Sequence, residues 1–392
     1  MLHFRLALLP AFALLLITFM ANDSAARDNL KDQLEPVRQE FALPALVAAV
    51  AHEGKIVAAG ASGVRAIGHD AKAELQDQIH IGSDTKAMTA LLAGMAVEEG
   101  RLAWDSTIGE VLGDEVQGMN ETLAKVRLEQ LLSHSSGIPS DTQEMIEIYF
   151  NTDAFDYNLT NLRLMALEAW KKNEPVIPEN SPFQYANFGY LIAGTMLETA
   201  MGQPWEALIQ QRIFQPLELE TAGLGATATP GLIDALVGHF PDDDGQPEPR
   251  LWGAAADIPP IMGPAGTAHM SILDFARWGG WIAGQAERGP DLVEPETLAY
   301  IMEPKVQAKI PDPPPGIPEE GGYALGWGFE QFDWAERPLH THNGSNSMNL
   351  AKILIDRDQD LAIVVATNIG GEQANLAAGE IMKTLYLTYG KD

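Results

Sequence analysis

The pattern of hydrophobic and polar positions predicts strands near both ends of the chain and helices between them. Two predicted strands, Ala45–Ala51 and Lys55–Ala59, are joined by a turn at residues 52–54 and follow an amphipathic helix over Asp28–Glu40. Three strands and a helix are predicted toward the C-terminus, over Tyr323–Phe332, Lys352–Ile355, Leu361–Thr367 and Glu372–Tyr389. The segment from Ser83 to about Ile310 is typical of helix and loop.

This order of elements predicts an α+β fold with one antiparallel sheet built from both ends of the chain. Helices flank the sheet, and a mainly helical subdomain is inserted into it. We expect residues 27–82 and 322–392 to form the sheet subdomain and residues 83–321 to form the insertion. The proline-rich stretch Ile310–Pro318 can be neither helix nor central strand, so it marks the return crossing between the two parts.

Residues 1–26 have the pattern of a signal peptide. Arg5 precedes an apolar run from Leu6 to Ala21, and small residues follow at positions 24–26, where a signal peptidase cleaves. We therefore expect a periplasmic or secreted protein without stable membrane insertion after cleavage. The run is short for a spanning helix and Pro10 interrupts it, which makes an uncleaved membrane anchor the weaker alternative.

Cysteine content and charge narrow the chemistry. The chain has no cysteine, which excludes disulfides, thiol catalysis and thiolate metal sites. The formal charge of −29, from 54 acidic and 25 basic residues, opposes binding to nucleic acid or to anionic membranes. The acidity suits either ordinary solubility or a salty environment, and composition does not choose between the two.

Ser83 and Lys86 are the first candidate catalytic residues. They stand three residues apart at the start of an Ala- and Met-rich helix, so both side chains lie on one helix face. A serine hydroxyl needs a base within hydrogen-bond reach, and a partly buried lysine with a lowered pKa can serve. An N-capping serine beside a surface lysine is the competing interpretation.

A second candidate segment precedes the predicted helix Leu191–Ala200. Tyr185 and Asn187 share one side of an extended stretch there. A phenol near an ammonium group can relay a proton, and an amide can orient a substrate carbonyl and bind the lysine. An aromatic loop anchor with a helix-capping asparagine is the alternative.

The third candidate segment, His342-Asn343-Gly344-Ser345, enters the strand region near the C-terminus. Gly344 is expected to permit close approach of a substrate to the strand backbone. Strand amides beside a nucleophile at a helix start can share a developing negative charge. We therefore assign an oxyanion hole to the backbone N–H groups of Ser83 and Ser345.

Together these motifs resemble the serine β-lactamase and penicillin-binding protein superfamily, in particular its branch of class C β-lactamases, D-alanyl-D-alanine carboxypeptidases and family VIII esterases. The chain has SDTK at Ser83–Lys86, YAN at Tyr185–Asn187 and HNG at His342–Gly344, in the order and approximate spacing of that branch. Segments similar to other stretches of the branch lie between them, at Leu131–Ile138, Ile213–Leu217 and Pro264–Gly266. The resemblance covers about residue 30 to the end.

The resemblance implies a β-lactamase/transpeptidase-like fold and an acyl-enzyme that water hydrolyses, without a cofactor or a metal. It implies Ser83 as the nucleophile, Lys86 as its proton partner and Tyr185 as general base or relay. Asn187 would contact both the substrate and the lysine. The oligomeric state is left open.

One departure from the branch bears on the substrate. In its KTG motif a lysine and a hydroxyl residue help to bind a substrate carboxylate, and His342 and Asn343 take their places here. With Gly344 and Ser345, they are expected to line the substrate site. We expect a secreted serine hydrolase of small esters, amides or peptides, of esterase or D-amino-acid-peptidase type. A β-lactamase, a D-alanyl-D-alanine carboxypeptidase and a slowly deacylating penicillin-binding sensor are the alternatives.

Other interpretations are weaker. His340 and His342 alternate along a strand, but no HExxH motif or carboxylate cluster accompanies them, so no metal site is predicted. Residues 356–360 resemble the start of a calcium loop without its glycine at position six, and a hairpin turn is expected instead. His134 is expected to be structural, with its ring satisfied by neighbouring hydroxyls. No GxSxG elbow surrounds Ser83, which argues against an α/β-hydrolase.

Overall fold

The computed structural model describes residues 28–151, 158–179, 181–242, 245–251, 253, 256–309 and 318–390. Its main element is a nine-stranded sheet in the order β1-β3-β2-β14-β13-β12-β11-β10-β9. The strands are β1 (Asp28–Asn29), β2 (Ala45–His52), β3 (Lys55–Gly63), β9 (Val306–Lys309), β10 (Glu320–Tyr323), β11 (Gly328–Glu330), β12 (Leu339–Ser345), β13 (Leu350–Asp356) and β14 (Leu361–Thr367). β1 pairs in parallel with β3, and the other neighbours are antiparallel. Strands from both ends of the chain meet where β2 pairs with β14, which confirms the predicted α+β fold.

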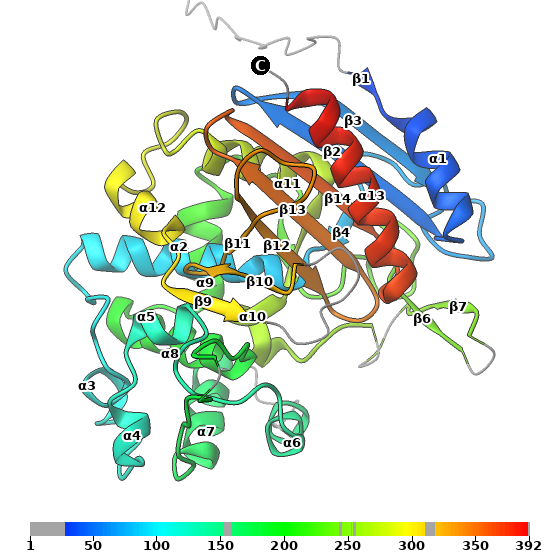
Figure 1. Ribbon diagram of the computed structural model, residues 1–392. Coiled ribbons are helices and arrows are strands. Elements are labelled where there is room, and N and C mark those ends of the chain that lie inside the picture. Colours follow the sequence, from blue (N-terminus) through cyan, green and yellow to red (C-terminus); the bar gives the residue numbers. More distant parts are fainter. Residues whose placement is uncertain are drawn as a thin grey trace, which may run out of the picture.

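Helices cover both faces of this sheet. On one face lie α1 (Lys31–Glu40) and α13 (Glu372–Tyr389), and Figure 1 shows α13 across the front of the sheet. On the other face α11 (Ile272–Ala283) packs against β2, β13 and β14. Every residue of β14 is buried, because helices cover this strand from both sides. A continuous apolar run such as Leu361–Thr367 is the expected sequence of such a strand.

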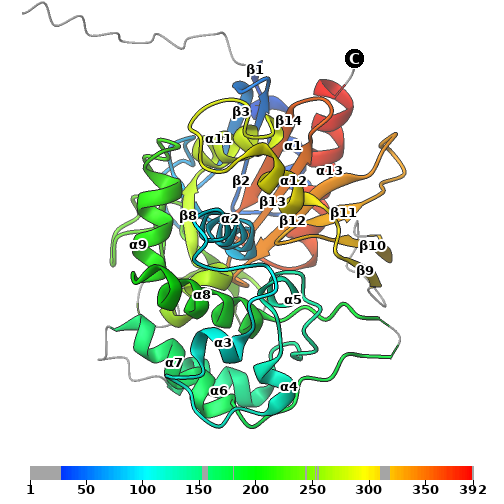
Figure 2. The same ribbon diagram turned by 90° about the vertical axis from the view of Figure 1, so that its left-hand side faces the viewer.

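A mainly helical part lies beyond one end of the sheet, at the bottom of Figures 1 and 2. It contains α3 (Ile108–Leu112), α4 (Glu121–Ala124), α5 (Leu128–Leu132), α6 (Gln143–Asn151), α7 (Leu159–Trp170) and α8 (Asn187–Met201). α9 (Trp205–Ile209), α10 (Gly263–Gly266) and α12 (Pro295–Met302) lie closer to the sheet. In the described part of the chain, no helix combines the length and the apolarity needed to cross a bilayer.

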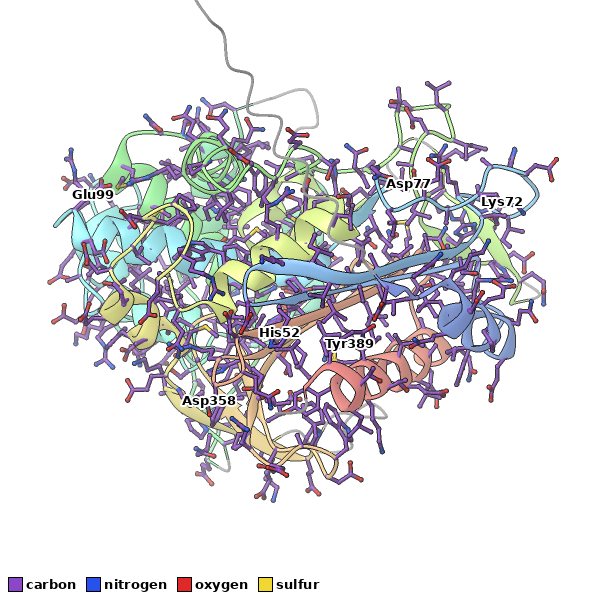
Figure 3. The ribbon with its side chains drawn as sticks, turned by 90° about the horizontal axis from the view of Figure 1, so that it is seen from above. His52, Lys72, Asp77, Glu99, Asp358 and Tyr389 are labelled. Atoms are coloured by element: carbon purple, nitrogen blue, oxygen red, sulfur yellow. The ribbon has the colours of Figure 1, made fainter. Side chains whose placement is uncertain are left out.

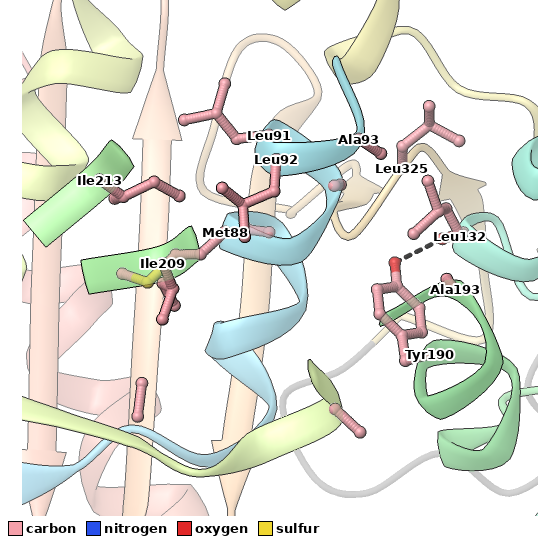
Figure 4. Packing of buried hydrophobic residues seen from close by; sticks show 14 of the residues in the cluster. Met88, Leu91, Leu92, Ala93, Leu132, Tyr190, Ala193, Ile209, Ile213 and Leu325 are labelled. Atoms are coloured by element: carbon pink, nitrogen blue, oxygen red, sulfur yellow. Dashed lines mark hydrogen bonds between the residues drawn. The ribbon is translucent and has the colours of Figure 1, made fainter. Parts of the chain in front are cut away.

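The helix α2 (Thr85–Glu98) lies at the centre of the molecule. All its residues from Thr85 to Ala96 are buried, as expected of a helix that is apolar on every side. Figure 4 shows Met88 and Leu92 of this helix near Ile209 and Ile213, with Tyr190 of α8 on the other side. α2 is therefore fixed by packing in every direction, and so is the turn that leads into it.

The insertion is less purely helical than expected. Its strands β5 (Gly223–Leu224) and β8 (Ala268–Ser271) form a three-stranded sheet, β4-β8-β5, with β4 (Gln78–His80), which precedes the insertion. A hairpin of β6 (His239–Pro241) and β7 (Pro247–Pro249) adds two more strands. Strands of two to four residues show too few alternating positions to be recognised by periodicity.

The predicted boundaries of the sheet subdomain also differ from the structure. β9 and the start of β10 precede residue 322 and yet pair in the main sheet, and α11 packs on it. The expected strand Tyr323–Phe332 is wrong: β10 ends at Tyr323, and the N–H of Ala324 donates to the carbonyl of Trp327 at 2.7 Å in a turn before β11. Gly326, with φ of +79°, lies in that turn.

Other expected elements match closely. The β2–β3 hairpin and α13 form at the predicted places, and α1 begins three residues late because Asp28 and Asn29 pair with β3. The calcium-like segment is the β13–β14 turn, in which Oδ1 of Asp356 accepts two backbone N–H groups. Figure 3 shows Asp358 of this turn near His52 at the end of β2. The predicted signal peptide and most of the proline-rich stretch lie outside the described residues.

Candidate active site

The candidate site lies where the start of α2, the start of α8 and strand β12 meet. Ser83 belongs to a 3-10 turn over Gly82–Asp84 that leads directly into α2, one turn earlier than a regular helix start. Lys86 follows in the first turn of α2, and its Nζ donates to Oγ of Ser83 at 3.0 Å. The expected pairing of serine and lysine on one face is present.

Lys86 is completely buried, so the surface-lysine interpretation is wrong. Its Nζ contacts three oxygens: Ser83 Oγ at 3.0 Å, Asn187 Oδ1 at 2.7 Å and the carbonyl of Ala265 at 2.6 Å. Burial lowers the pKa of Lys86 to about 7, while the carboxylates of Asp141 and Asp84 act in the opposite direction. A neutral amine here donates to Asn187 and Ala265 and keeps its lone pair for the serine hydroxyl.

Tyr185 completes the set of proton-carrying groups. Its hydroxyl shares a hydrogen bond with Ser83, and Nζ of Lys86 lies 4.8 Å from the centre of its ring. Burial raises the pKa of Tyr185 well above its usual value, and the Ser83 hydrogen bond offsets only part of this rise. The phenol is therefore neutral near pH 7, which suits a proton relay better than a free phenolate base.

Asn187 does not cap its helix. The N-cap of α8 is Ala186, without a side-chain cap, and Oδ1 of Asn187 accepts from Lys86 instead. Its Nδ2 donates to Oδ2 of Asp141 at 2.6 Å. The hydrogen bond to lysine that was expected of Asn187 is present, and the amide also links the lysine to a carboxylate that sequence reasoning missed.

Strand β12 passes directly against the serine turn. A Cβ on Gly344 would lie 1.8 Å from the carbonyl oxygen of Ile81, and one on Gly82 would lie 2.4 Å from the backbone nitrogen of Ser345. The backbone of the turn therefore requires glycine at 344, independently of the expected approach of a substrate. The contact places the backbone of Ser345 beside that of Ser83, which the predicted oxyanion hole requires.

His342 is buried beneath this contact. Its Nε2 lies 3.0 Å from the hydroxyl of Tyr323, and its Nδ1 lies 3.3 Å from Oδ1 of Asp84. Burial, together with the charge of Lys86, lowers the pKa of His342 to about 3, and burial raises that of Asp84 well above its usual value. The spacing of His342 and Asp84 fits an ion pair, but burial favours a neutral imidazole, so His342 supplies no cation.

A cavity of about 170 Å³ opens beside these groups. Its lining includes Tyr185, Tyr323, His342 and Asn343, and no lysine or arginine is among the described residues that line it. Burial raises the pKa of Glu330, also in the lining, to about 7. Ser345 lies outside this lining, and its Oγ donates to the carbonyl of Asn349.

The site supports comparison with known proteins. The Beta-lactamase family profile matches residues 30–385. The chain belongs to the Beta-lactamase family. This confirms the family resemblance of the three motifs, which the fold brings to one place.

Relatives in this family differ in length and name. Unguisins hydrolase of Aspergillus violaceofuscus is 27% identical over 275 residues, 66% of this chain and 45% of that protein. The chain spans about half the length of the two unguisins hydrolases that it matches. Penicillin-binding protein 4 of Amycolatopsis lactamdurans is 24% identical over 347 residues, 87% of this chain and 84% of that protein.

Solved structures share the fold of this chain. The octameric penicillin-binding protein homologue from Pyrococcus abyssi superposes with a TM-score of 0.71 at 23% identity, over 92% of this chain and 77% of that one. At this identity the likeness establishes the fold alone.

His134 is structural, but not in the expected way. Its Nδ1 accepts the N–H of Ala186 at 3.1 Å, and its carbonyl accepts the N–H of Gln184 at 2.7 Å. The hydroxyls of Ser133 and Ser135 pair with each other at 2.9 Å instead of binding the ring. His134 therefore holds the backbone on both sides of Tyr185.

His340 and His342, which alternate along β12, contact different partners. Nε2 of His340 lies 2.7 Å from the carbonyl of Met302, whereas His342 contacts Tyr323. Throughout the described ranges, no three His, Asp or Glu side chains are grouped so that they could hold a metal ion.

Sequence reasoning missed four contributors to the site. Asp84 stands inside the SDTK motif and Ala265 inside the segment Pro264–Gly266, but the sequence indicates no role for either. Tyr323 was placed in a strand by its pattern alone. Asp141 has no local signal, since only the folded chain brings it to Asn187, 46 residues away.

Proposed function

We propose that this protein is a serine hydrolase that forms an acyl-enzyme on Ser83 and hydrolyses small esters or amides, of esterase or D-amino-acid-peptidase type. The observation that carries the proposal is the buried amine of Lys86, 3.0 Å from Oγ of Ser83 and with a pKa lowered to about 7. At such a pKa, a large fraction of the amine is neutral near pH 7. Its position beside Ser83 allows this neutral amine to accept the proton of the nucleophile.

The first half of the reaction follows from these contacts. Oγ of Ser83 attacks the carbonyl carbon as the neutral amine of Lys86 takes the hydroxyl proton. The carbonyl oxygen becomes negative beside the backbone N–H groups of Ser83 and Ser345. The leaving group departs with a proton passed through Tyr185, and the acyl group stays on Ser83.

The second half reverses these roles with water. Lys86 and Tyr185 accept a proton from a water molecule that attacks the acyl carbon. The bond to Oγ breaks, Ser83 regains its proton, and the carboxylic acid leaves. Asn187 orients the substrate and keeps Nζ of Lys86 aimed at the serine through its 2.7 Å hydrogen bond.

The charges of the site favour an ester or amide over a β-lactam. A β-lactam and a C-terminal D-alanyl peptide each carry a carboxylate that needs a cation. His342 is neutral, and the described lining of the cavity has no lysine or arginine. One relative is named as a hydrolase of unguisins, which is consistent with the hydrolase part of the proposal.

Kinetics on matched substrates test the proposal. Wild type, Ser83→Ala and the control Thr384→Ala, which removes an exposed hydroxyl from α13, are assayed on p-nitrophenyl butyrate, D-alanine p-nitroanilide and a chromogenic cephalosporin. We expect turnover of the ester or the anilide, lost by at least about 1,000-fold in Ser83→Ala. Full activity in Ser83→Ala contradicts the mechanism. Preferred cephalosporin hydrolysis contradicts the substrate class, and an adduct without turnover makes the protein a sensor.

A further inference from the structure

We propose that Asp141 selects substrates that carry an ammonium group close to the scissile carbonyl. This inference rests on the proposed hydrolase function and narrows its substrate class. In this proposal Asp141, which lies outside the three motifs, supplies the electrostatic part of substrate recognition.

Asp141 is a carboxylate that hydrogen bonds hold against Asn187 of the site. It lies between α5 and α6, and its residue is exposed. Oδ2 accepts from Nδ2 of Asn187 at 2.6 Å, and Oδ1 accepts from the hydroxyl of Tyr149 at 3.0 Å. Two hydrogen bonds from opposite elements therefore orient a carboxylate that solvent, and hence a ligand, still reaches.

Only one side chain separates this carboxylate from the catalytic lysine. Asn187 accepts from Nζ of Lys86 through Oδ1 and donates to Asp141 through Nδ2. The charge of Asp141 raises the pKa of Lys86 more than that of any other group does, and it also raises the pKa of Tyr185. Its field therefore reaches the groups that contact the substrate.

No lysine or arginine in the described lining of the cavity offsets this charge. The hydrogen-bond donors to Asp141 are the neutral side chains of Asn187 and Tyr149. Lys86 must be neutral to act as base, and His342 is neutral through burial. Glu330 also lines the cavity, but it adds little net charge because the nearby buried Lys352 interacts with it. A cationic substituent is thus attracted and a carboxylate is repelled.

Holding Asn187 in place does not by itself require a charge. A neutral amide oxygen at position 141 could accept the same hydrogen bond from Nδ2 of Asn187. The variant Asp141→Asn keeps that acceptor and removes the charge, so it separates recognition of a cation from orientation of Asn187.

Matched probes of the two charge states test the inference. D-Alaninamide, a cation at pH 7, and neutral N-acetyl-D-alaninamide are compared as competitive inhibitors of p-nitrophenyl butyrate hydrolysis. In wild type at low salt, we expect the cation to bind about tenfold more tightly than the neutral probe. In Asp141→Asn this preference should fall to near one, and in Asp141→Glu it should be partly retained. The control Glu147→Gln, at an exposed position of α6, should keep the full preference.

Two results overturn the inference. One is a wild type that does not prefer the cation. The other is an equal loss of affinity for both probes in Asp141→Asn, because a misplaced Asn187 would weaken the binding of either probe. Probe binding to Ser83→Ala by calorimetry keeps the question separate from the proposed function, since binding to this variant needs no turnover.

Discussion

At the scale of single residues, burial determines the pKa of Lys86. The side chain is completely buried, yet no carboxylate of a described residue contacts it. Its hydrogen-bond partners are a hydroxyl, an amide oxygen and a backbone carbonyl. Neutral acceptors support an ammonium group less than a carboxylate would, so desolvation prevails and the pKa falls to about 7. The same surroundings that remove the proton also aim the lone pair at Ser83.

The pH dependence of activity follows from this pKa. Because Lys86 must be neutral to accept a proton, kcat/KM for p-nitrophenyl butyrate should rise with pH to a plateau, with its midpoint near 7. Asp141→Asn removes a charge that raises this pKa, so its midpoint should move to lower pH. A profile that stays flat between about pH 5 and 8, or a midpoint near that of free lysine at about 10, contradicts the assignment.

A second prediction concerns Gly344. A methyl group there meets the carbonyl of Ile81 at 1.8 Å, so Gly344→Ala should force β12 away from the serine turn. We expect a loss of about 1–3 kcal/mol in the free energy of unfolding, and at least a tenfold fall in kcat. Gly379→Ala in α13 is the control, since its Cβ makes only a 4.0 Å contact with Lys352 and alanine favours a helix. Equal stability of the two variants contradicts the assigned contact.

The local part of the site could be predicted from the sequence, and the rest could not. Ser83 and Lys86 lie in one helical turn, so their spacing alone brings them together. The contact of Asn187 with Lys86 joins residues 101 apart and was expected only because motifs resembled a family. Asp141 and Tyr323 reach the site through the packing of α6 and the path of β10, which no local pattern encodes.

At the scale of elements, a buried ion pair ties three helices together. Arg163 of α7 is completely buried, and its guanidinium contacts Glu198 of α8 at 2.6 Å and Glu206 of α9. Its Nε donates to the carbonyl of Ile261 at 3.1 Å. These contacts join α7, α8 and α9 near the C-terminal end of α8, the helix whose first residue is Asn187.

Removing this arginine should be costly. In Arg163→Met, Glu198 would stay buried without its cation, and we expect a loss of about 3–5 kcal/mol in the free energy of unfolding. The exposed Arg101→Met should change it by less than about 0.5 kcal/mol. Denaturant titration followed by far-UV circular dichroism measures both. A difference below about 1 kcal/mol between the variants would show that the pair contributes little beyond packing.

Whole elements were predicted where the hydrophobic pattern was long. The helix α13 has the predicted ends, and the β2–β3 hairpin has the predicted turn. The strands β5 and β9 were missed because two to four residues carry almost no periodicity. α11 was assigned to the insertion because its apolar face does not show whether a sheet or other helices will cover it.

At the scale of the whole molecule, both ends of the chain and the site depend on one sheet. β2, from the N-terminal part, pairs with β14, and β12 of the same sheet contacts the serine turn. The two parts of the fold are therefore coupled through this sheet. A formal charge of −29 acts on this assembly as a uniform repulsion.

Salt should therefore stabilise the protein. Raising NaCl from about 0.01 M to about 0.5 M shortens the screening length from about 30 Å to less than 8 Å, and we expect the Tm to rise by about 3 °C or more. Glucose at the same osmolality is the control for solvent exclusion. A Tm that does not change, or that falls, would show that repulsion among the acidic groups does not limit stability.

Mass spectrometry of the enzyme during turnover tests the central claim most directly. Wild type and Ser83→Ala are mixed with p-nitrophenyl butyrate, quenched in acid and digested with trypsin, which releases Ser83 in the peptide Ala73–Lys86. We expect a butyryl group on Ser83 in wild type, and neither this group nor turnover in Ser83→Ala. A butyryl group on another residue, or turnover that persists in Ser83→Ala, would contradict the assignment of Ser83 as the nucleophile.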